Sequence, residues 1–497
     1  MSRTVSNLGA QHHASPSRAE QAHPLLLPGL VFACLVSAVV SSLGAPLVPA
    51  IAAMDHVSTA SSQWVLTATM LAGAIATPTL GRLGDGRHRR KVILAAIAIV
   101  AAGCLVAALP VGFGIFLVGR ALQGLGLSLT PLAIAAVRDA LPVEKARPAV
   151  AILSITTVTG IGLGYPLTGL VAEAGGVHGA YWFGAAVALL ALLGAVVVVP
   201  ASRARSVDPL DVVGALLLAL GLCCLLLAIS EGEDWHWLSA RTDGAFVAGV
   251  ALLGLWIRHQ LRVAHPLVEL SLLRQRAVLT ANAAALLAGV GMYLLLSLTV
   301  RFVQTPTSTG YGMGASVVVG GLALVPFSVG SFVATRIAPA IARRTTHAGV
   351  LPLASAVLLA GMVMFSFARG SMTEIFVLMA ITGVGVGGIF AVVPGMLLRS
   401  VSAEETSSAM SFNQVLRYIG YAVGSALAGV ILASHTMAGH TYPGDGGYTA
   451  AGLVACGMWI VTGVVTGVLA LRLHQPEPPA DERLLAEESL ADAESAA

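Results

Sequence analysis

Residues 81–91 read GRLGDGRHRRK, a polar stretch between two long apolar runs. Five cations, one acid and three glycines occupy these eleven positions. The apolar run before the stretch begins near Ser62, and the run after it begins near Val92. Because the hydrocarbon core of a bilayer needs about 20 apolar residues per helix, the stretch is predicted to be a short cationic turn between two membrane-spanning helices.

The composition extends this prediction to the whole chain. Of its 497 residues, 57% are hydrophobic and only 10% are charged, whereas soluble domains carry about 25% charged residues. Fourteen apolar runs are long enough to span a bilayer, and they are continuous rather than alternating, which indicates helices and not a β-barrel. The predicted fold class is an all-α polytopic membrane protein with about fourteen spans. The runs begin near Leu25, Ser62, Val92, Val111, Pro148, Ala180, Leu210, Ala245, Val278, Ala315, Ala348, Thr373, Thr406 and Tyr448.

The positions of the cations give the predicted topology. Of the 27 lysines and arginines, 22 fall on the side that holds both chain termini and three on the other side. Cytoplasmic loops carry an excess of Lys and Arg, so both termini are predicted to be cytoplasmic. Arginines outnumber lysines by 25 to two, as is typical of GC-rich bacterial genomes, and the expected location is the cytoplasmic membrane. The remaining two cations, Arg120 and Arg417, lie inside apolar runs.

The last six runs echo the first six. A shift of 260 residues superposes glycines of the fifth and thirteenth runs: Gly160 on Gly420, Gly164 on Gly424, and Gly169 on Gly429. The alternative is a chance alignment of small residues, which are common in membrane helices. A parallel repeat predicts two six-helix bundles with two inserted helices between them. The predicted division is a cytoplasmic tail over 1–24, a first bundle over 25–200, a linker with two extra spans over 201–277, a second bundle over 278–472 and an acidic cytoplasmic tail over 473–497.

The composition also argues against several functional classes. The net charge of +3, without a basic and aromatic cluster, predicts no nucleic-acid partner. All five cysteines lie in apolar runs without metal-ligand spacing, so no metal site is expected. No HExxH motif and no mid-run Asp, Glu or His occurs, which leaves an intramembrane enzyme without its reacting groups. We expect no enzyme and no organic cofactor, and a monomer surrounded by membrane lipid.

The turn at 81–91 carries a family resemblance. With Gly81, Leu83, Asp85, Arg89 and Arg90 at this spacing after the second span, it resembles the signature GxLaDxxGRR of the major facilitator superfamily. One position departs from the signature, because His88 stands where the motif has its second glycine. The resemblance implies the major facilitator fold and a conformational latch between helices of the two halves. The alternative reading of the arginines is a positive-inside anchor beside a turn.

Two further motifs resemble those of the fourteen-span drug:proton antiporters in this superfamily. Arg120, Gln123 and Gly124 match its RxxqGxg run, which implies a role in proton coupling; the structural alternative is an Arg bonded to helix-end carbonyls. The fifth run resembles the antiporter motif GxxxGPxxGG, although Tyr165 separates glycine from proline and Leu170 replaces the last glycine. The matching positions are Gly160, Gly164, Pro166 and Gly169.

The expected cargo follows from the acids that are missing. A lipophilic cation needs a desolvated negative partner or an aromatic box, and no acid lies near the middle of a run. With Arg120 and Arg417 buried, the cavity is predicted to be neutral to positive, so a neutral or anionic amphiphile is favoured over a cationic drug. The carboxylates that remain for carrying a proton are terminal, namely Asp55, Asp85, Asp139 and Glu173; pairing with its neighbour Arg138 is the alternative for Asp139.

The sequence thus predicts a proton-coupled exporter of drug-like amphiphiles that works by alternating access. Asp55 and Asp139 join Arg120 as the coupling candidates, and the predicted cavity lining is Tyr165, Asn413, Gln414, Arg417 and Tyr418. The expected partners are a small-molecule substrate, protons and lipid. The alternatives are uptake or export of a small metabolite on the same fold, and a membrane scaffold that transports nothing.

Overall fold

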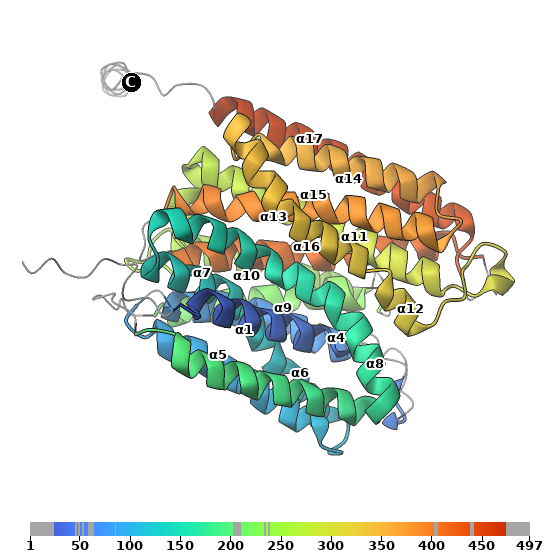
Figure 1. The fold of residues 1–497 in the computed structure, drawn as a ribbon, viewed down its shortest axis with the longest axis horizontal. Helices are drawn as coiled ribbons and strands as arrows, with labels where there is room; N and C mark the ends of the chain where they lie inside the picture. Colours follow the sequence, from blue (N-terminus) through green and yellow to red (C-terminus); the bar gives the residue numbers. More distant parts are fainter. Residues whose placement is uncertain are drawn as a thin grey trace, which may run out of the picture.

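The computed structural model describes residues 24–44, 47, 50–51, 54–57, 64–84, 86–201, 210–232, 235–236, 239–401, 406–437 and 442–473. Within these residues the chain forms helices joined by turns, and no strand occurs. The helices run side by side as long rods (Figure 1). Asp85 and almost all of the two predicted tails lie outside the described residues.

The predicted apolar runs coincide with helices. The helical elements are α1 (Leu26–Ser42), α4 (Trp64–Gly84), α5 (Arg89–Ala108), α6 (Phe113–Gly124), η1 (Leu125–Ser128), α7 (Leu129–Ala140), α8 (Val143–Val198), α9 (Val212–Glu231), α10 (Ala240–Gln260), η2 (Leu270–Arg274), α11 (Arg276–Gln304), η3 (Thr307–Thr309), α12 (Val317–Leu322), α13 (Val325–Arg344), α14 (Val350–Phe367), α15 (Met372–Leu398), α16 (Thr406–Ser434) and α17 (Asp445–Leu473). Twelve segments are long and apolar enough to cross a membrane. Adding the shorter α1 and dividing α8 at Gly176, whose φ is +67°, gives fourteen rods among the described residues. The predicted all-helical membrane fold is confirmed.

The rods pair in the same way in two sets (Figure 1). In the first set, α1 packs on α8, α4 on α6, and α5 on α8. In the second set, α11 packs on α16, α13 on α15, and α14 on α17. Counted by rod, each set therefore pairs its first with its fifth, its second with its fourth and its third with its sixth. The residue bounds of the two bundles stay a prediction.

Two glycines related by the 260-residue shift, Gly160 and Gly420, occupy equivalent contacts. A Cβ on Gly160 would lie 3.2 Å from the Leu35 carbonyl oxygen of α1. A Cβ on Gly420 would lie 2.9 Å from the Val290 backbone nitrogen of α11. In both sets, glycine lets the fifth rod approach the first rod closely, as small residues do in membrane helices.

The inserted pair, α9 and α10, is held by a polar network at one end. Asp211 caps α9 by accepting from the Gly214 N–H at 2.8 Å, and it also pairs with His259 at 2.9 Å and Gln260 at 2.8 Å. Burial raises the pKa of Asp211, but the hydrogen bonds from His259, Gly214 and Gln260 together outweigh this effect, so the pKa lies below its usual value. Helix α9 contacts both α4 and α16, so the pair lies over the seam between the two sets.

Arg120 ties three rods of the first set together. The side chain is fully buried, with 0% exposure. Its Nε donates to the Val65 carbonyl at 3.0 Å, and its Nη atoms donate to the carbonyls of Val40 at 3.1 Å and Ser41 at 2.9 Å. Val40 and Ser41 lie in the last turn of α1, where the Val40 carbonyl also accepts from the Leu43 N–H at 3.3 Å. The guanidinium therefore satisfies helix-end carbonyls of α1 while holding α4 and α6 against them.

We predict that Arg120→Gln lowers the stability of the folded protein by about 3 kcal/mol or more, because each hydrogen bond from a charged donor contributes about 1.5–3 kcal/mol. Thermal unfolding of the purified protein measures the loss. Arg301→Gln, at an exposed position of α11, is the matched control and should change little. A stable Arg120→Gln protein that has lost only its proton coupling would contradict the tie and favour the coupling role.

Candidate functional site

The described part of the predicted latch binds within the first set. Arg89 is 4% exposed, and its Nε donates to the Gly84 carbonyl at 2.8 Å. Its Nη1 lies 3.2 Å from a carboxylate oxygen of Asp139 and donates to the Ala135 carbonyl. Arg90 donates to the Val196 carbonyl of α8 at 2.8 Å. Of the other predicted latch positions, Gly81 is buried, Leu83 is exposed and Asp85 lies outside the described residues.

Arg138 makes the link between the sets at this end. The sequence offered Arg138 as the partner of Asp139, but Asp139 pairs with Arg89 instead. The Nη2 of Arg138 donates to the carbonyls of Leu398 at 2.9 Å and Val401 at 2.8 Å, where α15 ends. Its Nη1 donates to the hydroxyl of Thr406 at the start of α16. No motif or spacing distinguishes Arg138 from the many other arginines of this side.

The antiporter-like motif presents one face of α8 to α1. Gly160 and Gly164 share this face, and a Cβ on Gly164 would lie 3.3 Å from the Cα of Val39. These two glycines therefore serve packing inside the first set.

The other face of the same motif meets the second set. A Cβ on Gly162 would lie 3.1 Å from the Leu324 carbonyl oxygen, and one on Gly169 would lie 2.8 Å from Val318. A Cβ on Gly321 of α12 would lie 3.0 Å from the backbone nitrogen of Pro166, next to Tyr165. Small residues thus bring the two sets into contact along the part of α8 between Gly162 and the break at Gly176. Gly162 was not among the predicted site residues, although it lies inside the motif.

A large cavity lies between the sets where α8 begins, at the end of its first rod (residues 143–175) that is opposite Gly176. We call this the cationic end because the arginine-rich turns lie there. The volume of the cavity is about 870 Å³, and it is lined by α7 and α8 from the first set and by α13 and α15 from the second. None of the described side chains that line it is acidic. Its titratable lining residues are Arg138, Arg147, Arg336, Arg343, Arg399 and His347.

The electrostatics of this cavity are uniformly positive. Arg147, Arg343 and Arg399 are exposed, so the cavity mouth meets solvent. Burial, together with the charges of Arg399 and Arg147, lowers the pKa of His347 below its usual value. His347 is therefore neutral near pH 7, and the arginines supply the charge. The buried part of the lining is apolar and includes Val150 of the first set and Val392 of the second, each 2% exposed.

A second, smaller cavity contains three of the predicted lining residues. Asn413, Gln414 and Arg417 of α16 line it together with residues of α7, α8 and α15. The Nη1 of Arg417 donates to Gln414 Oε1 at 3.0 Å, and its Nη2 donates to the Tyr421 hydroxyl at 3.2 Å. The Arg417 guanidinium carbon lies 3.7 Å from the centre of the Phe390 ring. This distance places the cation on the negative face of the ring.

The other predicted residues lie near these cavities or apart from them. Asn413 donates to Asn282 Oδ1 at 3.0 Å inside the second set. Tyr418 donates to the Leu127 carbonyl at 3.3 Å and so bridges the sets. Gln123 accepts from Arg120. Asp55 is half-buried, and one of its carboxylate oxygens is buried without a hydrogen-bond partner among the described residues.

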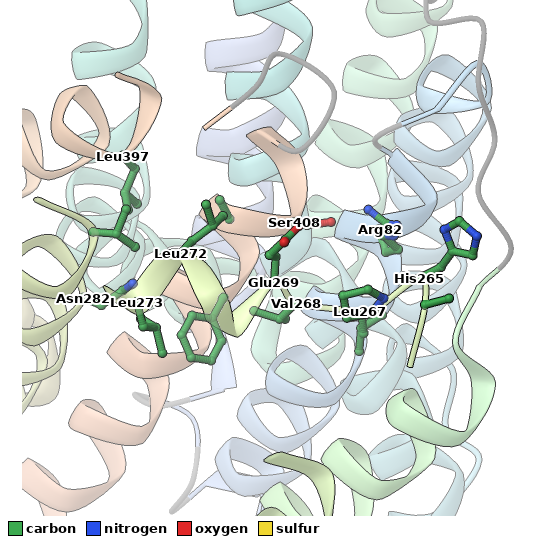
Figure 2. A pocket seen from close by; sticks show the side chains of 15 residues that line it. Arg82, His265, Leu267, Val268, Glu269, Leu272, Leu273, Asn282, Leu397 and Ser408 are labelled. Carbon is green, nitrogen blue, oxygen red and sulfur yellow. The ribbon is translucent and has the colours of Figure 1, made fainter. Parts of the chain in front are cut away.

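A third cavity, of about 220 Å³, lies beside the segment that joins the inserted pair to the second set (Figure 2). Figure 2 shows side chains reaching it from the end of α4, from the joining segment and from the start of α16. Arg82 and His265 meet Glu269 and Ser408 here, so the lining mixes charges of both signs. Its lining has no uniform charge and contains none of the predicted lining residues, although Asn282 in it bonds Asn413.

Comparisons with known proteins place the chain in a family. A model of the Major Facilitator Superfamily matches residues 30–424. An uncharacterised MFS-type transporter of Mycobacterium tuberculosis is 27% identical over 436 residues, covering 84% of this chain and 62% of that protein. The tetracenomycin C resistance and export protein of Streptomyces glaucescens is 27% identical over 446 residues, covering 88% of this chain and 80% of that protein.

A solved structure supports the fold. The crystal structure of the human organic anion transporter MFSD10 (TETRAN) superposes with a TM-score of 0.62 over 91% of this chain and 100% of that chain, at 16% identity, which speaks for the fold alone. The chain spans 62% of the length of the mycobacterial relative. Because the family model matches most of its length, the chain belongs to the Major Facilitator Superfamily.

Proposed function

We propose that this chain is a proton-coupled exporter of neutral or anionic amphiphiles, of the fourteen-span drug:proton antiporter type, working by alternating access between the two sets. The observation that carries the proposal is the 870 Å³ cavity between the sets, whose described lining holds five arginines and no acid. Family sites of this kind lie between the halves, and access alternates as the halves rock.

The two ends of the seam between the sets support one state of that cycle. Small residues of α8 and α12 pack closely at one end, as Gly169 against Val318 shows. At the cationic end the cavity is open at its mouth. By the positive-inside rule this end faces the cytoplasm, so the conformation fits one that loads cargo from inside the cell.

The charge of the cavity supports the cargo class. A positive lining attracts anions and raises their local concentration, and it repels cations of similar size. The apolar residues deeper in accept the hydrophobic part of an amphiphile. Export is supported by the tetracenomycin C exporter, whose similarity covers 88% of this chain.

Proton coupling rests on fewer groups. Asp55 has a carboxylate oxygen that is buried without a hydrogen-bond partner among the described residues. Asp139 is paired with Arg89 of the latch at 3.2 Å. We propose Asp55 as the proton carrier and Asp139 as a group that responds to the latch.

We predict that transport ranks three matched compounds by charge. In everted vesicles with an imposed pH gradient, an aromatic carboxylate should be taken up faster than its methyl ester, and the corresponding ammonium compound slowest. A protonophore should abolish the uptake. Efflux of the ammonium compound alone would contradict the cargo class, and accumulation only in intact cells, abolished by the protonophore, would favour the uptake of a metabolite.

We predict that Arg138→Gln shifts the protein toward the state open at the cationic end. The variant loses the bonds from α7 to the carbonyls of Leu398 and Val401, so the two sets separate more readily there. A cysteine placed at Thr346, in a background without native cysteines, should react faster with an impermeant maleimide. Arg336→Gln removes a charge from the same cavity and is the control; equal rates in both variants would contradict the link.

A further inference from the structure

The small central cavity holds buried donors without acceptors. Arg417 is 4% exposed and Gln414 is 3% exposed, and both lie near the middle of α16. The Nε of Arg417 and the Nε2 of Gln414 are buried without a hydrogen-bond partner among the described residues. Both atoms can only donate. Because a buried polar group without a partner is destabilising, these two donors require acceptor atoms from outside the described side chains.

Arg120 shows what a satisfied buried guanidinium looks like in this chain. Three carbonyls and Gln123 accept from it, and all four of these partners belong to the first set. Arg417 instead rests on the Phe390 ring, and its Nη atoms donate to two neutral side chains. No carboxylate lies among the described residues lining its cavity, so the positive charge remains to be neutralised.

The cavity is shared by the two sets. Thr130 and Ser154 face it from α7 and α8, while Phe390, Gln414 and Arg417 face it from α15 and α16. A molecule bound here touches both sets and therefore senses their relative position. Ser154 donates its proton to the Val150 carbonyl at 2.7 Å, and the Thr130 hydroxyl is bonded to that of Thr157 at 2.8 Å. The guanidinium of Arg417 and the amide of Gln414 are therefore the groups suited to hold an acidic group here.

Val150 of α8 lines the large cavity, and Ser154, one helical turn further along the same face of α8, lines the small cavity. The two cavities are therefore separated by about 6 Å along this helix. The small cavity holds about 10 Å³ in this conformation, which is the space of about one water. An acidic group would reach Arg417 when the two sets move apart, while the apolar body stays among the residues that line the large cavity.

We propose that Arg417 and Gln414 form the binding site for the acidic group of the cargo, and that the cargo is an aromatic or otherwise apolar acid. This assignment rests on the proposed function, and it narrows the cargo class to anions. Gln414 positions the guanidinium through its Oε1 and offers its Nε2 to the ligand. Phe390 holds the guanidinium plane on the far side.

Binding of three fluorescent probes to the purified protein in nanodiscs tests the assignment. The probes are 1-pyrenebutyrate, its methyl ester and 4-(1-pyrenyl)butylammonium, with binding to empty nanodiscs subtracted. Wild type should bind the acid more tightly than the ester. Arg417→Gln should weaken binding of the acid by about ten- to a hundredfold, as expected for the loss of a charged hydrogen bond, and leave the ester nearly unchanged.

Two further variants sharpen the result. Gln414→Glu gives Arg417 a carboxylate of its own and should weaken binding of the acid by a similar factor. Arg301→Gln removes an exposed charge from α11 and should change nothing. Unchanged binding of the acid to Arg417→Gln, or an equal loss for acid and ester, would overturn the assignment while leaving the proposed export intact. Failure of the wild type to bind any of the three probes would count against the proposed export and the acid site together.

Discussion

Buried guanidinium groups in this protein must find acceptors in a membrane interior without carboxylates. Every acidic residue within a described helix lies in the first or last turn of its rod. Arg120 of α6 donates to carbonyls near the ends of α1 and α4, and these bonds hold the three helices together. Arg369, near the other end, combines carbonyls of α14 with the terminal acid Asp445 at 2.6 Å. Arg417 has neither kind of partner, which is why the same constraint leads to a ligand site there.

The glycines of the antiporter-like motif in α8 make two different kinds of contact. Glycines of α8 face α1 on one side and α12 on the other, so this helix packs inside the first set and also forms part of the contact between the two sets. Close backbone contact of this kind needs no side-chain ordering. When the contact between α8 and α12 opens or closes, the helices shift between discrete packings, as expected for helices that rock about a central site. The arginine-rich end works differently, because Arg138 crosses the seam through carbonyls at the end of α15 and the Thr406 hydroxyl.

Much of the fold could be predicted from the sequence, because length and hydropathy decide which segments lie in lipid. The fourteen runs became rods, and the glycine shift became the matching contacts of Gly160 and Gly420. The partners of individual charges could not be predicted, since adjacency in sequence says little about adjacency across rods. Asp139 pairs with Arg89, fifty residues earlier, and its neighbour Arg138 reaches the other set. In the sequence, the cavity arginines resemble positive-inside anchors. Only the tertiary fold brings Arg147 and Arg399 together at the mouth of the large cavity.

In the proposed site, an acid group of the cargo completes the donors around Arg417. A structure of the protein with a bound brominated aromatic acid, located by the anomalous signal of bromine, is the sharpest test of this site. We expect the bromine beside Val150 or Val392, with the carboxylate within hydrogen-bond distance of Arg417 and Gln414. Bromine bound on the lipid-facing surface, or a carboxylate held only by the arginines at the cavity mouth, would contradict it.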